Sequence, residues 1–127
     1  MSEDKSQIKI LLVDDDKFLL DMYYLKFKKT GLEIDSSSSS LSALEKIRGG
    51  NSYDIVVMDI IMPGIDGLEL LETIRKEKLL PNSAIIMLTN QSDDIEKAKN
   101  LGVDGYIIKA TTIPSEVVEQ VISIYKK

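Results

Sequence analysis

Short apolar segments recur along this chain at nearly regular intervals, and stretches with helical spacing lie between them. The apolar segments begin near residues 8, 32, 54, 84 and 105. Four of them are rich in Ile or Val and stand beside turn residues, as buried strands do, and the segment at 32–35 is a weaker fifth. Strands that alternate with helices in this way predict an α/β fold, a parallel sheet with right-handed crossovers and helices on both faces.

The segments between the strands carry apolar residues at helical spacing, which we interpret as the core-facing stripes of five helices. Gly49 and Gly102 end the second and fourth helices, and Pro114 suits the first turn of the fifth. The serine run at 36–40 is expected to be a loop that ends in a helix N-cap, and Asp16 is expected to be a helix cap. The stripes comprise Phe18, Met22 and Leu25; Leu41, Leu44 and Ile47; Leu68, Leu71 and Ile74; Ile95, Ala98 and Leu101; and Val117, Val121 and Ile124.

Composition narrows the chemistry that the chain can perform. Its 127 residues predict a single domain, with residues 1–7 as a polar tail. A net charge of −5 argues against a nucleic-acid partner. The absence of His and Cys excludes Ser-His triads, thiol nucleophiles and zinc sites built from these residues. Because neither a signal peptide nor an apolar run as long as a membrane span is visible, we expect a cytoplasmic protein without membrane contact.

Polar side chains close four of the predicted strands. In open α/β sheets, ligands bind beyond the carboxyl ends of the strands. These side chains are therefore expected to share one rim of the sheet. They are Asp14, Asp15 and Asp16 after the first strand, Asp59 after the third, Thr89 after the fourth and Lys109 after the fifth.

Three of these acids, Asp14, Asp15 and Asp59, predict a site for a hard cation. Carboxylates held close together raise one another's pKa unless a cation joins them. Oxygen ligands select Mg²⁺ or Mn²⁺. Such a cation, with the ammonium of Lys109 and the hydroxyl of Thr89, suits a phosphoryl group. A carboxylate can also be the nucleophile itself, which would give an aspartyl-phosphate.

A family resemblance covers nearly the whole chain. It is carried by ILLVDDD (10–16), DIVVMDIIMPGIDGLELLETIR (54–75), IIMLTN (85–90) and LGVDGYIIKA (101–110). These stretches resemble the receiver domain of bacterial two-component response regulators, especially the stand-alone chemotaxis and phosphorelay type. The resemblance implies a flavodoxin-like, doubly wound sheet of five parallel strands in the order 2-1-3-4-5, with five helices. It also implies a signalling protein that accepts a phosphoryl group, not a metabolic enzyme.

The matched positions imply a role for each acid on the rim. Asp59 matches the phosphorylated aspartate of the family. Asp14 and Asp15 match its acidic pair, of which the second usually binds Mg²⁺ directly and the first through water. The backbone carbonyl of Ile61 matches the third protein ligand of the metal.

The resemblance also implies a switch that follows phosphorylation. Thr89 matches the switch hydroxyl, Lys109 the active-site lysine and Tyr106 the aromatic switch residue on the fifth strand. The implied output face consists of the fourth helix, the fifth strand and the fifth helix. Because the chain contains no His, the phosphoryl donor has to be external, a sensor histidine kinase or a histidine phosphotransfer protein.

Two positions depart from the family pattern. Ala110 stands where Pro usually follows the lysine, and Asn90 stands where Ala or Gly usually follows the switch hydroxyl. The family's Lys-Pro bond is usually cis, but a cis bond without proline costs about 2.5–4 kcal/mol. We therefore expect a trans Lys109–Ala110 bond, with residues 110–113 rearranged so that the amine reaches Asp59.

Three alternatives stay open on the sequence. Asp14 and Asp16, spaced by one residue after a strand, resemble the nucleophile motif of haloacid-dehalogenase phosphatases, which would turn over phosphate esters. A receiver-like adaptor would respond to contact alone and would never be phosphorylated. The wide apolar arc of the fifth helix is either a broad core face or, as we favour, a core face combined with a partner or homodimer surface.

Overall fold

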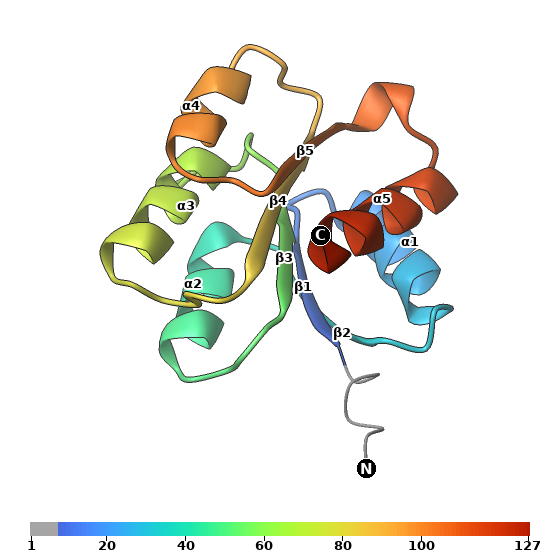
Figure 1. Ribbon diagram of the computed structural model, residues 1–127, viewed down its shortest axis with the longest axis horizontal. Helices are drawn as coiled ribbons and strands as arrows, with labels where there is room; N and C mark the ends of the chain where they lie inside the picture. The colour runs from blue at the N-terminus through green and yellow to red at the C-terminus, as the bar shows by residue number, and fades with distance from the viewer. Residues whose placement is uncertain (1–7) are drawn as a thin grey trace.

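A computed structural model describes residues 8–127, which form a five-stranded parallel sheet (Figure 1). The strand order is β2-β1-β3-β4-β5, which confirms the expected flavodoxin-like topology. The expected tail at residues 1–7 lies outside the described residues. The strands are β1 (Lys9–Val13), β2 (Glu33–Ser37), β3 (Ile55–Met58), β4 (Ala84–Thr89) and β5 (Gly105–Ile108).

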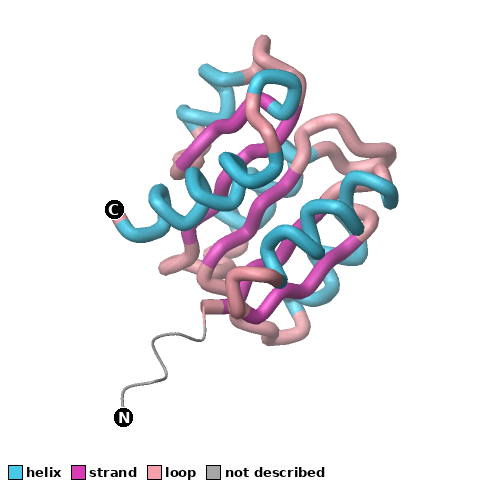
Figure 2. Tube along the Cα trace, turned by 90° about the vertical axis from the view of Figure 1, so that its right-hand side faces the viewer, coloured by secondary structure: helices cyan, strands magenta, loops and turns pink. Residues whose placement is uncertain are grey.

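Helices cover both faces of the sheet, as Figure 1 and, from the side, Figure 2 show. On one face lie α1 and α5, and on the other α2, α3 and α4. Alternate residues of a strand serve the two faces: Val13 belongs to the cluster under α2 and α3, and Leu12 to the cluster under α1 and α5. The helices are α1 (Lys17–Lys28), α2 (Ser40–Arg48), α3 (Gly67–Lys76), α4 (Ile95–Asn100) and α5 (Pro114–Lys126), with a short 3-10 helix, η2 (Lys109–Thr111), before α5.

The helix starts follow the expected caps. The side chain of Asp16 accepts a hydrogen bond from the Leu19 N–H and caps α1, and Pro114 is the first residue of α5. Ser39 caps α2 by accepting from the Ser42 N–H. The prediction of a loop at residues 36–40 is wrong for its first two residues, because Ser36 and Ser37 complete β2 by pairing with β1.

The predicted core stripe of α1 is also wrong. Phe18 and Leu25 are exposed by 80% and 61%, and the buried residues are Leu20, Tyr23 and Phe27. This helix carries apolar residues on two sides, so spacing alone does not say which side meets the sheet. The packing of α1 against β1 and β2 selects the side with the two large aromatic rings.

The other helices present the expected sides with one further exception. Leu41 on α2 is exposed, while Leu44 and Ile47 are buried as predicted. The wide apolar arc of α5 packs against the core cluster between this helix and the sheet. A partner protein is therefore not needed to explain the arc. Val117, Val118 and Val121 are buried, and Ile122, Ile124 and Tyr125 are partly buried against the same cluster.

Among residues 8–127 no peptide bond is cis, which confirms the expected trans bond between Lys109 and Ala110. In the same range, every helix is too short or too polar to cross a membrane.

Candidate functional site

The expected site residues lie together because the strands end in register. Val13 is level with Met58, Met58 with Met87, and Thr89 with Ile108. The ladder continues for one residue beyond β1 and β3, because the Asp14 N–H donates to Ser37 and the Asp59 N–H donates to Val13. The side chains that follow each strand therefore meet at one edge of the sheet.

Lys109 joins two of the acids. Its Nζ lies 2.7 Å from Asp14 Oδ2 and 2.8 Å from Asp59 Oδ2. All three side chains are largely buried, with exposed fractions of 9%, 8% and 12%. The second oxygens accept backbone hydrogen bonds, Asp14 Oδ1 from the Asp16 N–H and Asp59 Oδ1 from the Ile60 N–H. Each carboxylate is thus held at both oxygens and cannot rotate freely.

Asp15 completes a cluster of three carboxylates. One oxygen each from Asp14, Asp15 and Asp59 lie within 4.8 Å of one another, and Asp15 is the exposed member. One ammonium cannot balance three carboxylates, so the cluster keeps an excess of negative charge. The all-oxygen donor set fits a hard divalent cation such as Mg²⁺.

Burial and pairing shift the pKa values of this cluster. Burial raises the pKa of the Asp14 carboxyl, and the hydrogen bonds from Lys109 and the Asp16 N–H offset only part of that rise. Burial lowers the pKa of the Lys109 ammonium, but the bonds to Asp14 and Asp59 outweigh it and leave the pKa above its usual value. Lys109 therefore stays positively charged. The ionised form of Asp14 would be stabilised further by a second cation.

Thr89 and Tyr106 meet at the segment between β4 and α4. Thr89 is fully buried, and its Oγ1 accepts a hydrogen bond from the Gln91 N–H at 3.2 Å. The hydroxyl of Tyr106 donates to the carbonyl of the same residue, Gln91. Sequence analysis missed Gln91, because a backbone role leaves no signal in the residue type.

A pocket of about 380 Å³ opens over the acidic cluster. Ile61, Thr89 and Asn90 line it together with the acids and Lys109. Asn90, one of the departures from the family pattern, also forms a bond there: its Oδ1 accepts a hydrogen bond from the Ala110 N–H at 2.7 Å. This hydrogen bond joins a side chain to a backbone N–H twenty residues away in the sequence, and neither residue type alone predicts it.

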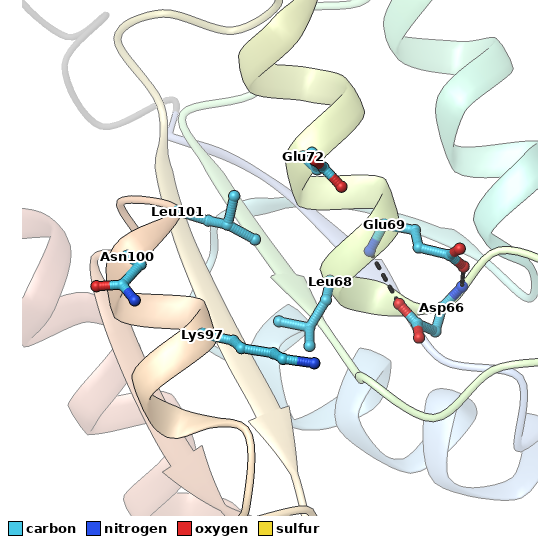
Figure 3. A pocket seen from close by; sticks show the side chains of 7 residues that line it. All are labelled: Asp66, Leu68, Glu69, Glu72, Lys97, Asn100 and Leu101. Carbon is cyan, nitrogen blue, oxygen red and sulfur yellow. Dashed lines mark hydrogen bonds between the residues drawn. The ribbon is translucent and has the colours of Figure 1, made fainter.

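A second hollow, of about 490 Å³, lies between α3 and α4 (Figure 3). Its carboxylates Asp66 and Glu69 are occupied with capping α3, each accepting a hydrogen bond from the other's backbone N–H. Lys97 and Leu101 reach into the hollow from the side of α4. Glu72 adds a third carboxylate to this hollow, but the buried ammonium that bridges two carboxylates lies in the strand-end pocket.

Comparison with known protein families identifies what this chain is similar to. The family model described as "Response regulator receiver domain" matches residues 10–121. The transcriptional regulatory protein ResD of Bacillus subtilis is 32% identical over 124 residues, which cover 96% of this chain and 50% of ResD. The chain thus spans about half the length of the curated relatives it matches.

Solved structures show the same similarity. The receiver domain of Francisella response regulator 1452 superposes with a TM-score of 0.83 at 30% identity, covering 94% of this chain and 98% of that one. The response regulator TrrA of Thermotoga maritima, solved in complex with Mg(2+)-BeF, gives a TM-score of 0.80 at 35% identity, covering 93% and 99%.

Proposed function

Because this chain belongs to the response regulator receiver domain family of two-component systems, we propose that Asp59 accepts a phosphoryl group from a phosphohistidine of a partner protein. The observation that best supports this proposal is the position of the Lys109 ammonium between Asp14 and Asp59, beside the third acid, Asp15. Membership of this family also removes the haloacid-dehalogenase alternative. We treat residues 1–127 as one receiver unit.

We propose that Asp14, Asp15 and Asp59, with the backbone carbonyl of Ile61, hold Mg²⁺. The excess of negative charge in the cluster and its all-oxygen donors support this assignment. When bound there, the metal would supply positive charge to the oxygens of a phosphoryl group. Asp15 is the exposed acid, and therefore the one that a hydrated cation meets first.

The chain's own residues prepare Asp59 for attack on phosphorus. A carboxylate oxygen of Asp59 forms the new O–P bond while the P–N bond to the partner's imidazole breaks, and the released imidazole takes up a proton from water. Lys109 fixes the orientation of the Asp59 carboxylate before the reaction and neutralises charge on the phosphoryl oxygens during it. The Ile60 N–H holds the other oxygen of Asp59 in place.

The phosphoryl donor has to dock over the pocket, which the exposed side chain of Ile61 lines, and two further exposed apolar side chains follow pocket residues closely in the sequence. Phe18 near the start of α1, Ile61 after β3 and Ile113 before α5 are exposed by 80%, 61% and 60%. Each lies only a few residues from an acid or lysine of the pocket. We propose that Phe18, Ile61 and Ile113 contact the kinase or phosphotransfer protein, since exposed apolar groups near one site are typical of an interface.

The switch would act through the segment that Thr89 and Tyr106 share. A phosphoryl oxygen on Asp59 would accept the Thr89 O–H and draw that hydroxyl toward itself. Because the same hydroxyl oxygen accepts from the Gln91 N–H, the Gln91 backbone and the Tyr106 hydroxyl bonded to it have to adjust. The segment leads into α4, a helix of six residues of which only Ala98 is buried. Movement of so weakly packed a helix costs little free energy. The hollow beside α3 leaves room for it (Figure 3).

The proposal is tested by phosphorylation with a small phosphodonor and Mg²⁺, followed by intact mass measurement. The parent chain should gain one phosphoryl group, and Asp59→Asn should gain none. Asp21→Asn, an exposed aspartate on α1, is the matched control and should behave like the parent. A phosphorylated Asp59→Asn variant would show that another acid is the acceptor, and a parent that never reacts would favour the adaptor alternative.

A further inference from the structure

One hydrogen bond connects the loops that follow β4 and β5. Asn90 comes directly after the buried Thr89, and its Oδ1 accepts from the Ala110 N–H at 2.7 Å. A backbone N–H can only donate, so the carbonyl oxygen of the Asn90 side chain has to face it. Both residues are exposed, and the bond therefore spans two surface loops instead of satisfying a buried group.

The donor belongs to the peptide group that follows Lys109. Because a peptide group is planar, a bond to the Ala110 N–H also fixes the orientation of the Lys109 carbonyl and limits where the Lys109 side chain can start. That side chain ends between Asp14 and Asp59. The acceptor side chain is itself anchored, since Asn90 continues from the fully buried end of β4.

Apart from the Lys109 ammonium, which binds Asp14 and Asp59, the turn that carries Lys109 has mainly local contacts to hold it. η2 consists of three residues, of which Ala110 and Thr111 are exposed and only the side chain of Lys109 reaches inward. Its backbone bond, from the Thr112 N–H to the Lys109 carbonyl, is 3.3 Å long and local. Asn90 is thus the side chain that ties this turn to the neighbouring strand among the described residues.

Asn90 and Ala110 each supply one half of this bond. Proline at position 110 would have no N–H to donate, and alanine or glycine at position 90 would have no oxygen to accept. These are the two positions at which the sequence departs from the family pattern. The departures therefore complement each other.

We propose that Asn90 is a positioning residue, which holds the trans Lys109–Ala110 peptide and thereby aims the Lys109 ammonium between Asp14 and Asp59. The proposal rests on the function proposed for this pocket. If Asn90 positions Lys109, its removal slows phosphorylation. If Asn90 only obstructed the pocket, its removal would speed phosphorylation.

Asn90→Leu tests the proposal, because leucine keeps the size of asparagine and removes the acceptor. With acetyl phosphate and Mg²⁺, phosphorylation should slow about fivefold, as expected for the loss of one hydrogen bond. Amide exchange at Ala110 should accelerate by at least the same factor, and Asn90→Asp should restore its protection. Asn51→Ala is the matched control: it removes a similar exposed bond, from Asn51 Nδ2 to the Lys46 carbonyl, and should leave the rate unchanged.

The Lys109→Ala background separates positioning from general loosening. There, Asn90→Leu should cause no further loss of rate, because the lysine it positions is gone. An unchanged or faster rate for Asn90→Leu, an equal loss in both backgrounds, or unaltered Ala110 exchange would each overturn the proposal. A parent chain that takes up no phosphoryl group would contradict the proposed function, and the exchange measurement would still decide whether Asn90 holds the Ala110 N–H.

Discussion

Lys109 organises the pocket at the scale of single residues. Its ammonium is buried to the same extent as the two carboxylates it bridges, so each charge depends on the others for compensation. Removal of Lys109 would leave two buried carboxylates without a cation, which is why the chemistry of this pocket cannot be assigned to Asp59 alone. The same arrangement leaves Asp15, the exposed acid, as the position most open to a cation.

Ile61 bears on how long the phosphoryl group lasts. It lines the pocket two residues after Asp59 and is exposed, but its side chain offers no group to orient a water in line with phosphorus. We predict that Ile61→Asn shortens the phosphoryl lifetime roughly fivefold, the effect of one orienting hydrogen bond. Loss of the phosphoryl mass over time measures it. Ile61→Val, which removes bulk without adding a polar group, should resemble the parent, and equal lifetimes for all three chains would contradict the idea.

Tyr53 supports the fold far from the pocket. Its hydroxyl donates to Asp35 Oδ2 at 2.7 Å, and Lys46 Nζ lies 2.9 Å from Asp35 Oδ1. Burial raises the pKa of the Asp35 carboxyl, but the bonds from Tyr53 and Lys46 outweigh it and leave the pKa below its usual value. Stability from this carboxylate is therefore present above the unfolded-state pKa and is lost as the pH falls through the lower, folded-state pKa.

We accordingly predict that Tyr53→Phe lowers the free energy of unfolding by about 1 kcal/mol at neutral pH, allowing for the partial exposure of Asp35. The difference should shrink as the pH falls from the ordinary pKa of an unfolded-state aspartate, about 3.9, through the lower folded-state pKa of Asp35, because protonation removes the charge that the Tyr53 hydroxyl stabilises. Urea unfolding at several pH values measures both effects. Tyr24→Phe, on α1 outside this network, is the control; a Tyr53→Phe deficit that stays constant in acid would contradict the mechanism.

At the scale of elements, the backbone at the end of β3 lies very close to the backbone at the start of α3. A Cβ added to Gly67 would lie 2.1 Å from the carbonyl oxygen of Asp59 and 2.8 Å from the Cα of Ile60. The Gly67 N–H also donates to the Ile60 carbonyl at 2.8 Å. The glycine is therefore required by its close backbone approach to Asp59, the proposed phosphoryl acceptor.

We predict that Gly67→Ala destabilises the fold by about 1–3 kcal/mol, as overpacking does, and also slows phosphorylation because Asp59 has to move. Gly64→Ala is the comparison in the same loop. Its φ of +78° is strained for alanine, but the space around it is open, so the expected cost is only about 1–2 kcal/mol and Asp59 stays in place. Unfolding free energies and phosphorylation rates of the two variants distinguish these outcomes. Equal rates would show that Gly67 does not constrain Asp59.

The helices divide into firmly and loosely held elements. α3 buries Leu70, Leu71 and Ile74 and has a complete capping box, whereas α4 buries Ala98 alone. This contrast locates the proposed movement in α4. It also explains why phosphorylation could alter that surface without disturbing the core.

At the scale of the whole molecule, the chain carries a net charge of −5, and the acidic pocket, where three carboxylates face one ammonium, contributes two of these negative charges. A cation bound there favours the folded chain, because the unfolded chain does not bring these acids together. We predict that Mg²⁺ at ten times its dissociation constant stabilises the protein by about 1.4 kcal/mol. This corresponds to a rise in Tm of roughly 5 °C.

Asp15→Asn should remove most of this Mg²⁺-dependent rise in Tm. Asp16→Asn is matched to it, because it removes the adjacent charge while asparagine still caps α1. Thermal unfolding with and without Mg²⁺, and again after removal of the metal with a chelator, measures the effect. The same Tm response in both variants would exclude Asp15 as a ligand.

By itself, the sequence determined the alternation of strands and helices and the chemistry at the strand ends. Both are local properties: continuous apolar runs show which strands are buried on both faces, and Asp14, Asp59 and Lys109 follow their strands directly while Thr89 ends its own. In a parallel sheet, strand ends meet at one edge, so residue type and position were enough to predict the pocket. The strand order came from family resemblance, since spacing alone does not say which strands are neighbours.

Only the tertiary structure decided which side of α1 faces the sheet. The helix is apolar on two sides, and Phe18 and Leu25 are left exposed because packing against β1 and β2 favours Tyr23 and Phe27. The tertiary structure likewise decided that Asn90 meets the Ala110 N–H and that Thr89 and Tyr106 share Gln91. These contacts depend on how loops approach one another after the sheet has formed, and no local preference of either partner encodes that approach.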